Sequence, residues 1–266
     1  MRTVGKIVDV KTELENIDKW IKDYFANNGP KSKAVIGISG GKDSTIAAMM
    51  LVKALGKDGV IGIKMPNGVQ KDIRDANIVC EVLGIKSYTI NIEDICNEFY
   101  DTFDTYTFED RDPSIVINTP PRVRMTILYM MAATIGGRVV NTSNASESYV
   151  GYCTKFGDLA GDLALLQNYY VREVVEMGTE LLKEFPEMPS TLIDKAPADG
   201  LTGLTDAEKL GFSYDELDSM MLDGIYPSAE KVALIKAKNK TANHKRECIR
   251  IPAPYPRRVS EDGWNF

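Results

Sequence analysis

The feature that most constrains the fold is an apolar segment at 34–38 that passes through a glycine-rich turn into a helical segment at 45–55. Residues 34–38 are small or β-branched, which is typical of a buried parallel strand. The turn reads Ser-Gly-Gly-Lys-Asp-Ser at 39–44. A glycine-rich turn that opens a helix leaves backbone N–H groups without partners, and the helix dipole favours an anion there. The sequence therefore predicts a phosphate-binding turn at the end of a strand.

The aspartate in this turn predicts a metal as well. Asp43 would repel a phosphate unless a Mg²⁺ ion lay between them. The turn lacks the Walker A pattern, because Ile36 stands five residues before Gly41 and Asp43 follows Lys42. It also lacks the G-x-G-x-x-G fingerprint of dinucleotide-binding folds. On these residues alone, an incidental glycine-rich connection is the remaining alternative.

Composition and charge favour an ordinary soluble protein. The 266 residues carry a net charge of −6 and are 44% hydrophobic, so we expect no nucleic-acid partner. The four cysteines form no Cys-x-x-Cys pair, which argues against a zinc knuckle and fits a reducing compartment. No apolar run reaches the roughly 18 residues that a membrane span needs, and the N-terminus lacks the apolar core of a signal peptide. We therefore expect a cytoplasmic protein with no membrane association.

Predicted strands alternate with predicted helices along most of the chain. This alternation is typical of parallel βαβ units. We therefore predict an α/β fold: a doubly wound, mostly parallel, Rossmann-like sheet with helices on both faces and a C-terminal helical appendage. The whole chain, 1–266, forms a single domain in this interpretation, with the α/β core at 12–184 and a helical segment and tail at 185–266. The predicted strands lie at 34–38, 60–65, 87–91 and 138–142, and the predicted helices at 12–25, 45–55, 72–83, 92–103, 122–135, 168–183, 205–211, 213–222 and 227–242.

Several segments carry less regular patterns. Residues 104–121 show no sustained period, so we expect a long loop there. The helix at 122–135 is apolar on nearly every side, which predicts burial either in the core or in a subunit interface. Residues 143–162 read as a polar loop rich in groups that can bind a ligand, and 185–205 as a proline-rich connector.

The glycine-rich turn resembles the pyrophosphate loop of the N-type ATP pyrophosphatases. From about residue 14 to residue 250, the chain resembles more specifically the ammonia-dependent NAD synthetases of that superfamily. The motifs that carry the resemblance follow in the family's order: Met-Pro-Asn-Gly-Val-Gln-Lys-Asp at 65–72, Pro-Arg-Val-Arg-Met at 121–125, Asn-Thr-Ser-Asn-Ala-Ser-Glu at 141–147, Gly-Tyr-Cys-Thr-Lys-Phe-Gly-Asp at 151–158, Leu-Gly-Phe-Ser-Tyr-Asp-Glu-Leu-Asp at 210–218 and His-Lys-Arg at 244–246.

The resemblance implies a ligase that converts deamido-NAD, ATP and ammonia into NAD, AMP and pyrophosphate through an acyl adenylate. It implies Mg²⁺ held by Asp43 and Glu147, which would be the catalytic residues through that metal, and a homodimer formed by helix 122–135. Arg124 lies two residues after Arg122, so it points elsewhere on the helix and is expected to be structural. The implied ATP contacts are Gly37, Ser39, Gly40, Gly41, Lys42, Asp43, Ser44, Lys64, Gln70 and Thr142, and the implied deamido-NAD contacts are Arg122, Lys155, Asp162, His244 and Lys245.

Two positions depart from the family pattern. The helix after Asp162 usually carries a lysine that reaches the ATP phosphates, but the aligned residue here is Val171. A hydroxyl residue is expected at the position of Ala198. The missing positive charge predicts weaker transition-state stabilisation, unless Arg172 or Lys42 replaces it. The alternative to an active synthetase is therefore a non-catalytic or weakly active nucleotide-binding paralogue, or another N-type ATP pyrophosphatase.

Overall fold

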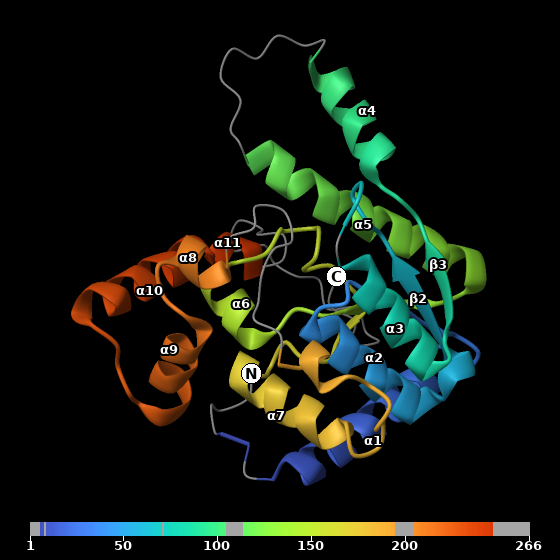
Figure 1. Ribbon diagram of the computed structural model, residues 1–266, viewed down its shortest axis with the longest axis horizontal. Coiled ribbons are helices and arrows are strands. Elements are labelled where there is room, and N and C mark those ends of the chain that lie inside the picture. Colours follow the sequence, from blue (N-terminus) through green and yellow to red (C-terminus); the bar gives the residue numbers. More distant parts are fainter. Residues whose placement is uncertain (1–5, 8, 71, 105–113, 195–204, 247–266) are drawn as a thin grey trace, which may run out of the picture.

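A five-stranded parallel sheet forms the centre of the molecule (Figure 1). The computed structural model describes residues 6–7, 9–70, 72–104, 114–194 and 205–246. The strands run in the spatial order β3-β2-β1-β4-β5, and each neighbouring pair is parallel. The prediction of a doubly wound α/β fold is therefore confirmed. The strands are β1 (Ala34–Gly37), β2 (Val60–Lys64), β3 (Lys86–Thr89), β4 (Arg138–Asn141) and β5 (Leu163–Ala164).

Strand β1 lies between β2 and β4, because the chain builds β2 and β3 on one side of it and then returns to its other side. In the register, Ile36 lies opposite Gly62 on β2 and opposite Val140 on β4. The strand order therefore reverses between the carboxyl ends of β1 and β4. Open α/β sheets bind their ligands in the crevice outside such a point. The predicted phosphate turn begins there, directly after β1.

Helices cover both faces of the sheet. One hydrophobic core joins α1, α2, α3 and α7 to the sheet, and a second joins α4 and α5 to its other face. Ile36 belongs to the first core and Val35 to the second, as the two-residue period of a strand requires. The helices are α1 (Val10–Asn28), α2 (Lys42–Leu55), α3 (Ile73–Leu83), α4 (Glu93–Asp104), α5 (Ser114–Ile135), α6 (Ala145–Val150), α7 (Val171–Leu181), α8 (Asp206–Leu210), α9 (Tyr214–Asp218), α10 (Ala229–Thr241) and α11 (Asn243–Arg246).

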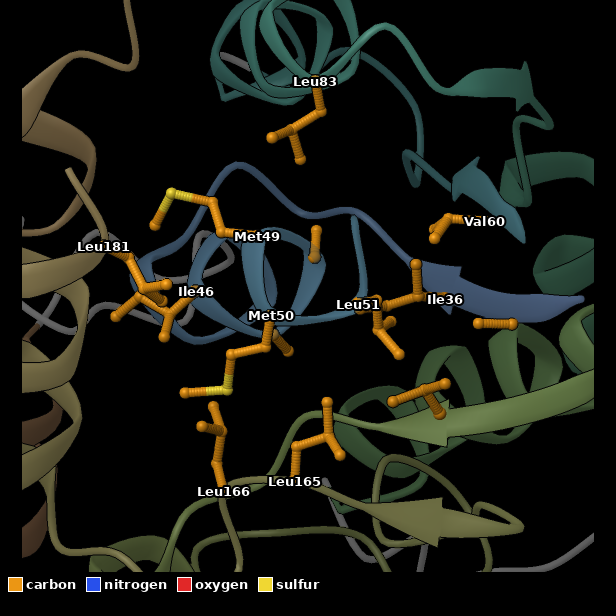
Figure 2. Packing of buried hydrophobic residues seen from close by; sticks show 14 of the residues in the cluster. Ile36, Ile46, Met49, Met50, Leu51, Val60, Leu83, Leu165, Leu166 and Leu181 are labelled. Carbon is orange, nitrogen blue, oxygen red and sulfur yellow. The ribbon is translucent and has the colours of Figure 1, made fainter. Parts of the chain in front are cut away.

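Helix α2 is buried along most of its length, and this burial fixes the turn that precedes it. Ile46, Met49 and Leu51 are fully buried. Figure 2 shows these side chains between Leu181 of α7 and the strands of the sheet. A Cβ atom at Gly178 would lie 2.7 Å from Ile46 Cδ1, so α7 approaches α2 closely only because this residue is glycine. The start of α2 is thus held from several sides.

A third, smaller core joins the last third of the chain to α6. It contains Val150 of α6 together with Phe212, Leu217 of α9 and Ile235 of α10. This core places α8, α9 and α10 beside the sheet rather than on it (Figure 1). The division of the chain at residue 184 stays a prediction.

Helix α5 begins earlier than the sequence indicates. The expectation of a loop at 104–121 is wrong for 114–121, which form the first turns of α5, while 105–113 lie outside the described residues. Pro120 and Pro121 lie inside this helix, and each lacks the N–H that would bond the carbonyl four residues before it. The Tyr100 hydroxyl donates to the Val116 carbonyl at 3.4 Å instead, which replaces the bond that Pro120 cannot make. Tertiary contacts therefore override the helix-breaking signal.

The same helix is not buried on every side. Val123, Ile127 and Ala132 face the sheet, whereas Met130 is 65% exposed. The expectation of burial in the core is therefore wrong for the outer face of α5. Burial of that face in a subunit interface stays a prediction.

Two short elements escaped prediction in the polar segment 143–162 and just after it. Helix α6 has six residues and β5 has two, so neither is long enough to show a period. Asn144 caps α6: its side chain accepts from the Glu147 backbone N–H at 3.0 Å, and the Glu147 carboxylate accepts from the Asn144 N–H at 3.3 Å. The predicted tail after 246 lies outside the described residues. Among the described helices, none combines the length and apolar character needed to cross a bilayer.

Candidate functional site

A cavity of about 370 Å³ opens at the carboxyl ends of β1, β2 and β4. Its walls come from these strand ends, from the turn at 39–44 and from the starts of α2 and α3. Helix α6 and α8 each add an acidic side chain, Glu147 and Asp206. The cavity therefore occupies the position at which the strand order reverses.

The backbone of the turn depends on glycine at position 40. Gly40 has a φ of +80°, a conformation that L side chains rarely adopt. A Cβ atom there would lie 2.8 Å from the Ala76 nitrogen and 2.9 Å from the Asp72 carbonyl oxygen. The turn is therefore pressed against the start of α3, so that the amino ends of α2 and α3 both border the cavity.

Two serine hydroxyls hold the turn in shape. The Ser39 and Ser44 hydroxyl oxygens lie 3.0 Å apart. The Gly41 N–H donates to the Ser39 hydroxyl at 3.1 Å, and the Ser44 hydroxyl donates to the Gly41 carbonyl at 3.1 Å. The turn is thus preformed, and both hydroxyls border the cavity, where an anion can reach them.

Lys42 and Asp43 form an ion pair in the cavity wall. The Lys42 Nζ atom lies 2.9 Å from Asp43 Oδ2, and the lysine side chain is only 5% exposed. Burial lowers the pKa of Lys42, but the charges of Asp43, Glu147 and Asp206 more than offset it, and the net effect raises that pKa. Lys42 is therefore a charged ammonium among carboxylates.

Glu147 faces this pair from α6. Burial and the charge of Asp43 raise the pKa of Glu147 to about 8, against the opposing charge of Lys42. Asn144 connects the two acids, because its Nδ2 atom donates to Asp43 Oδ1 at 3.4 Å while its Oδ1 accepts from the Glu147 N–H. The two carboxylates are consequently held in one wall, where the charge of Asp43 disfavours the charge of Glu147.

This donor set fits a magnesium ion. Mg²⁺ binds through oxygen and commonly uses only one or two carboxylates, with substrate phosphates and water completing its shell. Within the described residues, no group of three or more acidic, histidine or cysteine side chains could hold a metal on its own. A magnesium site that is completed by substrate phosphates needs one or two carboxylates beside the phosphate turn. Asp43 and Glu147 are two such carboxylates in the cavity wall.

The floor of the cavity is polar and internally bonded. The Asn141 amide donates to the Asp158 carbonyl at 2.6 Å, and the Ser143 hydroxyl donates to the same carbonyl at 3.2 Å. The Asp158 carboxylate accepts from the Thr154 N–H at 2.6 Å, and burial raises its pKa. These bonds fix the segment that carries Asp158 and Thr142 along the cavity.

The structure brings most of the predicted ATP contacts together. Gly40 lies on the side of the turn that packs against the start of α3. Lys64 is the exception, because its ammonium donates to Asn77 of α3 at 2.6 Å and does not line the cavity. The predicted residues that line the cavity are Gly37, Ser39, Gly41, Lys42, Asp43, Ser44, Gln70, Thr142 and Glu147.

The residues predicted to contact deamido-NAD lie outside this cavity and form hydrogen bonds with other groups of the protein. Arg122 Nε donates to the Lys155 carbonyl at 3.3 Å, and the Lys155 ammonium donates to the His244 carbonyl. Lys245 donates to the carbonyls of Gly151 and Cys153, at 2.8 and 2.7 Å. These residues join α5 and α11 to the segment after α6.

Asp162 also lies outside the cavity. Its carboxylate accepts from the Val139 N–H at 2.7 Å, so it ties β5 to β4 at the edge of the sheet.

Arg124, Asp158 and Asp206 are among the cavity residues that sequence reasoning missed. Arg124, which was expected to point away, lines the cavity, and its Nε donates to the Met65 carbonyl at 3.0 Å. Asp206 reaches the cavity from α8, far along the chain. Asp158 lay inside a quoted motif but had no assigned role. The helical offset between Arg122 and Arg124 was the one available signal, since it puts the two side chains on nearly opposite sides.

The position that departs from the family pattern lies at the start of α7. Val171 packs against the third core. The next residue, Arg172, forms ion pairs with Asp223 and, at 3.2 Å, with Asp215, and it donates to Ser219 at 2.6 Å. The Arg172 guanidinium therefore binds the C-terminal helices and does not line the cavity. Ala198 lies outside the described residues.

Comparison with known proteins identifies relatives along nearly the whole chain. The chain is 40% identical to the NH(3)-dependent NAD(+) synthetase of Pyrococcus furiosus over 79% of each chain. It is 35% identical to that of Thermococcus kodakarensis over 91% of this chain and 96% of the relative.

Solved structures agree with this result. The NMN synthetase of Francisella tularensis superimposes with a TM-score of 0.83 at 34% identity, over 93% of this chain and all of that one. The NH3-dependent NAD synthetase of Campylobacter jejuni superimposes with a TM-score of 0.73 at 24% identity, which supports the fold alone. The family model described as NAD synthase matches residues 13–250. With that match and the identities above, the chain belongs to the NAD synthase family.

Proposed function

We propose that this protein makes NAD from deamido-NAD, ATP and ammonia, with AMP and pyrophosphate as the other products. Membership of the family makes the protein a ligase with ATP as a substrate. The observation that carries the proposal is the cavity after β1, where a preformed phosphate turn, a buried ammonium and two carboxylates meet.

The first chemical step of the proposal brings two anions together. An oxygen of the nicotinate carboxylate attacks the α-phosphorus of ATP, and the bond to the β-phosphate breaks, so that pyrophosphate leaves with the bonding electrons. Charge neutralisation therefore dominates the barrier. The backbone N–H groups at the start of α2 and the hydroxyls of Ser39 and Ser44 would hold the leaving pyrophosphate.

Asp43 and Glu147 would hold Mg²⁺ against these phosphates. When bound, the ion supplies Lewis-acid stabilisation of the charge that develops on the phosphate oxygens. Asn144 positions both ligands through its side chain, so the pair is set before the metal arrives.

In the second step, ammonia attacks the carbonyl carbon of the acyl adenylate, loses a proton, and AMP leaves. Ammonium needs an anionic site at which to bind before it reacts. Asp158 supplies a carboxylate beside Thr142 and Ser143 in the same part of the cavity. Deamido-NAD extends beyond this cavity, and Arg122, Lys155 and His244, which are linked in one chain of contacts, form the surface that we propose for the rest of the dinucleotide.

A homodimer belongs to the same proposal. Helices α4 and α5 lie together at one end of the molecule (Figure 1). Both helices carry apolar side chains that are exposed to solvent. Exposed apolar side chains on two neighbouring helices are candidates for an interaction site. The exposed residues are Ile95, Phe99, Phe103, Val116, Ile117 and Met130. We expect light scattering to give twice the mass of the 29.5 kDa chain.

A second candidate function is amidation of nicotinate mononucleotide to nicotinamide mononucleotide. The 34% identity and TM-score of 0.83 to the NMN synthetase of Francisella tularensis favour it. The predicted contacts to the second nucleotide bond to other protein groups, as a smaller substrate would allow. The two functions share every atom of the reacting centre and differ only in substrate length.

One assay tests both. The protein is incubated with ATP, Mg²⁺ and ammonium, and either deamido-NAD or nicotinate mononucleotide. We expect equal amounts of NAD and AMP, with a higher kcat/KM for deamido-NAD. A higher kcat/KM for the mononucleotide would establish the second function instead. Tight ATP binding without turnover of either substrate would point to the non-catalytic paralogue, and release of ADP would contradict the adenylation step.

A further inference from the structure

The cavity contains a buried positive charge whose partner is itself a proposed metal ligand. Lys42 is the first residue of α2, its side chain is 5% exposed, and its ammonium lies 2.9 Å from Asp43 Oδ2. Asp43 offers its other oxygen to Asn144. In the absence of ligand, both carboxylate oxygens of Asp43 are thus occupied by groups of the protein.

Three acidic side chains act on Lys42 in the cavity wall. Glu147 from α6 and Asp206 from α8 line the same space, and their charges, with that of Asp43, favour the protonated lysine. An ammonium in such a cluster neutralises charges that would otherwise repel one another at short range. Lys42 is therefore the counter-ion of the acids that a metal would bind.

The other candidate cation, Arg172 at the start of α7, binds residues away from the cavity. Arg172 pairs with Asp223 and Asp215 and donates to Ser219, all in the C-terminal segment. Val171 before it carries no charge. Of these two candidates for a positive charge beside the phosphates, Lys42 is the one that lines the cavity.

A divalent cation that binds Asp43 must displace Lys42 or lie beside it. Like charges at this distance repel, so the ammonium loses its partner when the metal arrives. Lys42 belongs to the turn at 39–44 that we propose for the phosphates, and phosphate oxygens carry the opposite charge to its ammonium.

We propose that Lys42 exchanges partners during the reaction: it neutralises Asp43 in the empty site and binds an ATP phosphate once a metal occupies Asp43. The proposal rests on the proposed function only in taking ATP as the ligand of this cavity. It assigns the lysine side chain a role of its own, in addition to the backbone of the turn.

The exchange predicts opposite effects on two ligands. Replacing Lys42 by methionine removes a competitor for Asp43, so the affinity for Mn²⁺ alone, measured by electron paramagnetic resonance, should rise by about tenfold. The same variant loses the phosphate contact that forms once a metal occupies Asp43, so its affinity for ATP at saturating Mg²⁺, measured by calorimetry, should fall by about tenfold. Lys53→Met is the matched control, because Lys53 lies in the last turn of the same helix, pairs with Glu184 and does not line the cavity.

Opposite shifts in Lys42→Met, with neither shift in Lys53→Met, would support the exchange. Unchanged affinities, or a loss of both, would overturn it, because a merely structural lysine would weaken both ligands together. If Lys42→Met does not fold by circular dichroism, Lys42→Gln carries the same two expectations, because its side chain is also neutral. Failure to form NAD would reject the proposed substrate but would leave both binding measurements valid.

Discussion

Asn144 Nδ2 lies 3.4 Å from Asp43 Oδ1, so the residue that caps α6 also touches the carboxylate at the start of α2. Asn144 is fully buried, and its Oδ1 accepts from the Glu147 N–H. One side chain thereby sets the position of both proposed metal ligands. Because the two helices follow β1 and β4, this contact spans the point at which the strand order reverses.

We expect Asn144→Ala to lower both stability and activity. Loss of the cap costs about 1 kcal/mol in the free energy of unfolding, and Glu147 loses the bond that orients its helix. Urea unfolding and the rate of NAD formation measure the two effects. Ser228→Ala is the control, since Ser228 caps α10 in the same way and lies away from the cavity. Equal loss of activity in both variants would show that capping alone, and not the contact to Asp43, explains the result.

Gly40→Ala should abolish ATP binding. An alanine at position 40 would be held at an unfavourable φ. Its methyl group would also press on the backbone of α3, at 2.8 Å from the Ala76 nitrogen. Gly56→Ala separates the two effects, because Gly56 has a φ of +72° with no atom within 4 Å of the added Cβ. That control should lose only about 1 kcal/mol of stability and bind ATP normally. Normal binding by Gly40→Ala would show that the turn does not hold the phosphates.

Asp43→Asn and Glu147→Gln should each lower kcat by at least about a hundredfold, because each removes one of two ligands for Mg²⁺. Raising the Mg²⁺ concentration should recover part of the activity if metal affinity is what was lost. Glu184→Gln serves as a control, since this exposed carboxylate pairs with Lys53 outside the cavity. Full activity of either cavity variant at ordinary Mg²⁺ would remove that residue from the metal site.

Asp218 should make stability depend on pH. It is fully buried, accepts from the Ser146 hydroxyl at 2.7 Å and from the Arg172 N–H at 2.8 Å, and burial raises its pKa to about 6. Between its ordinary value near 3.8 and about 6, the folded state binds more protons than the unfolded state. The free energy of unfolding must therefore fall as pH rises through this window and level off above it.

Asp218→Asn removes this titration. The stability difference between wild type and variant should thus shift in favour of the variant from pH 4 to pH 7, by up to about 3 kcal/mol, as measured by urea unfolding. Asp215→Asn, on the same helix but with a side chain that is 83% exposed, should show no such trend. A pH-independent difference for Asp218→Asn would mean that the carboxyl group does not change its protonation in this range.

The sheet could be predicted because its strands are apolar and separated by helices with a clear period. Element α6 could not, since six residues span less than two turns. Helix α5 shows a different limit: its prolines are a correct local signal for a break, and only the distant Tyr100 hydroxyl supplies the bond that lets the helix continue.

In the site, the motif at 39–44 predicted from local residues alone the glycine-rich turn that borders the cavity, and phosphate binding by this turn stays a prediction. Arg124 was expected to point away from the site and lines the cavity instead, because a two-residue offset fixes the relative direction of the two arginines of α5 but not which of them faces the cavity. Asp206 could not be predicted for another reason. It enters the cavity through the packing of α8 against α6, and no local sequence pattern encodes that contact.

The acidic wall has a consequence for synthesis on the ribosome. The turn and Lys42 emerge early, Glu147 appears after more than half of the chain, and Asp206 comes later still. A nascent chain that has folded only its first strands has the glycine-rich turn and the Lys42–Asp43 ion pair, but not the two further acids of the wall. Glu147 joins the wall with α6 and Asp206 with α8, so the complete acidic wall forms only late in translation.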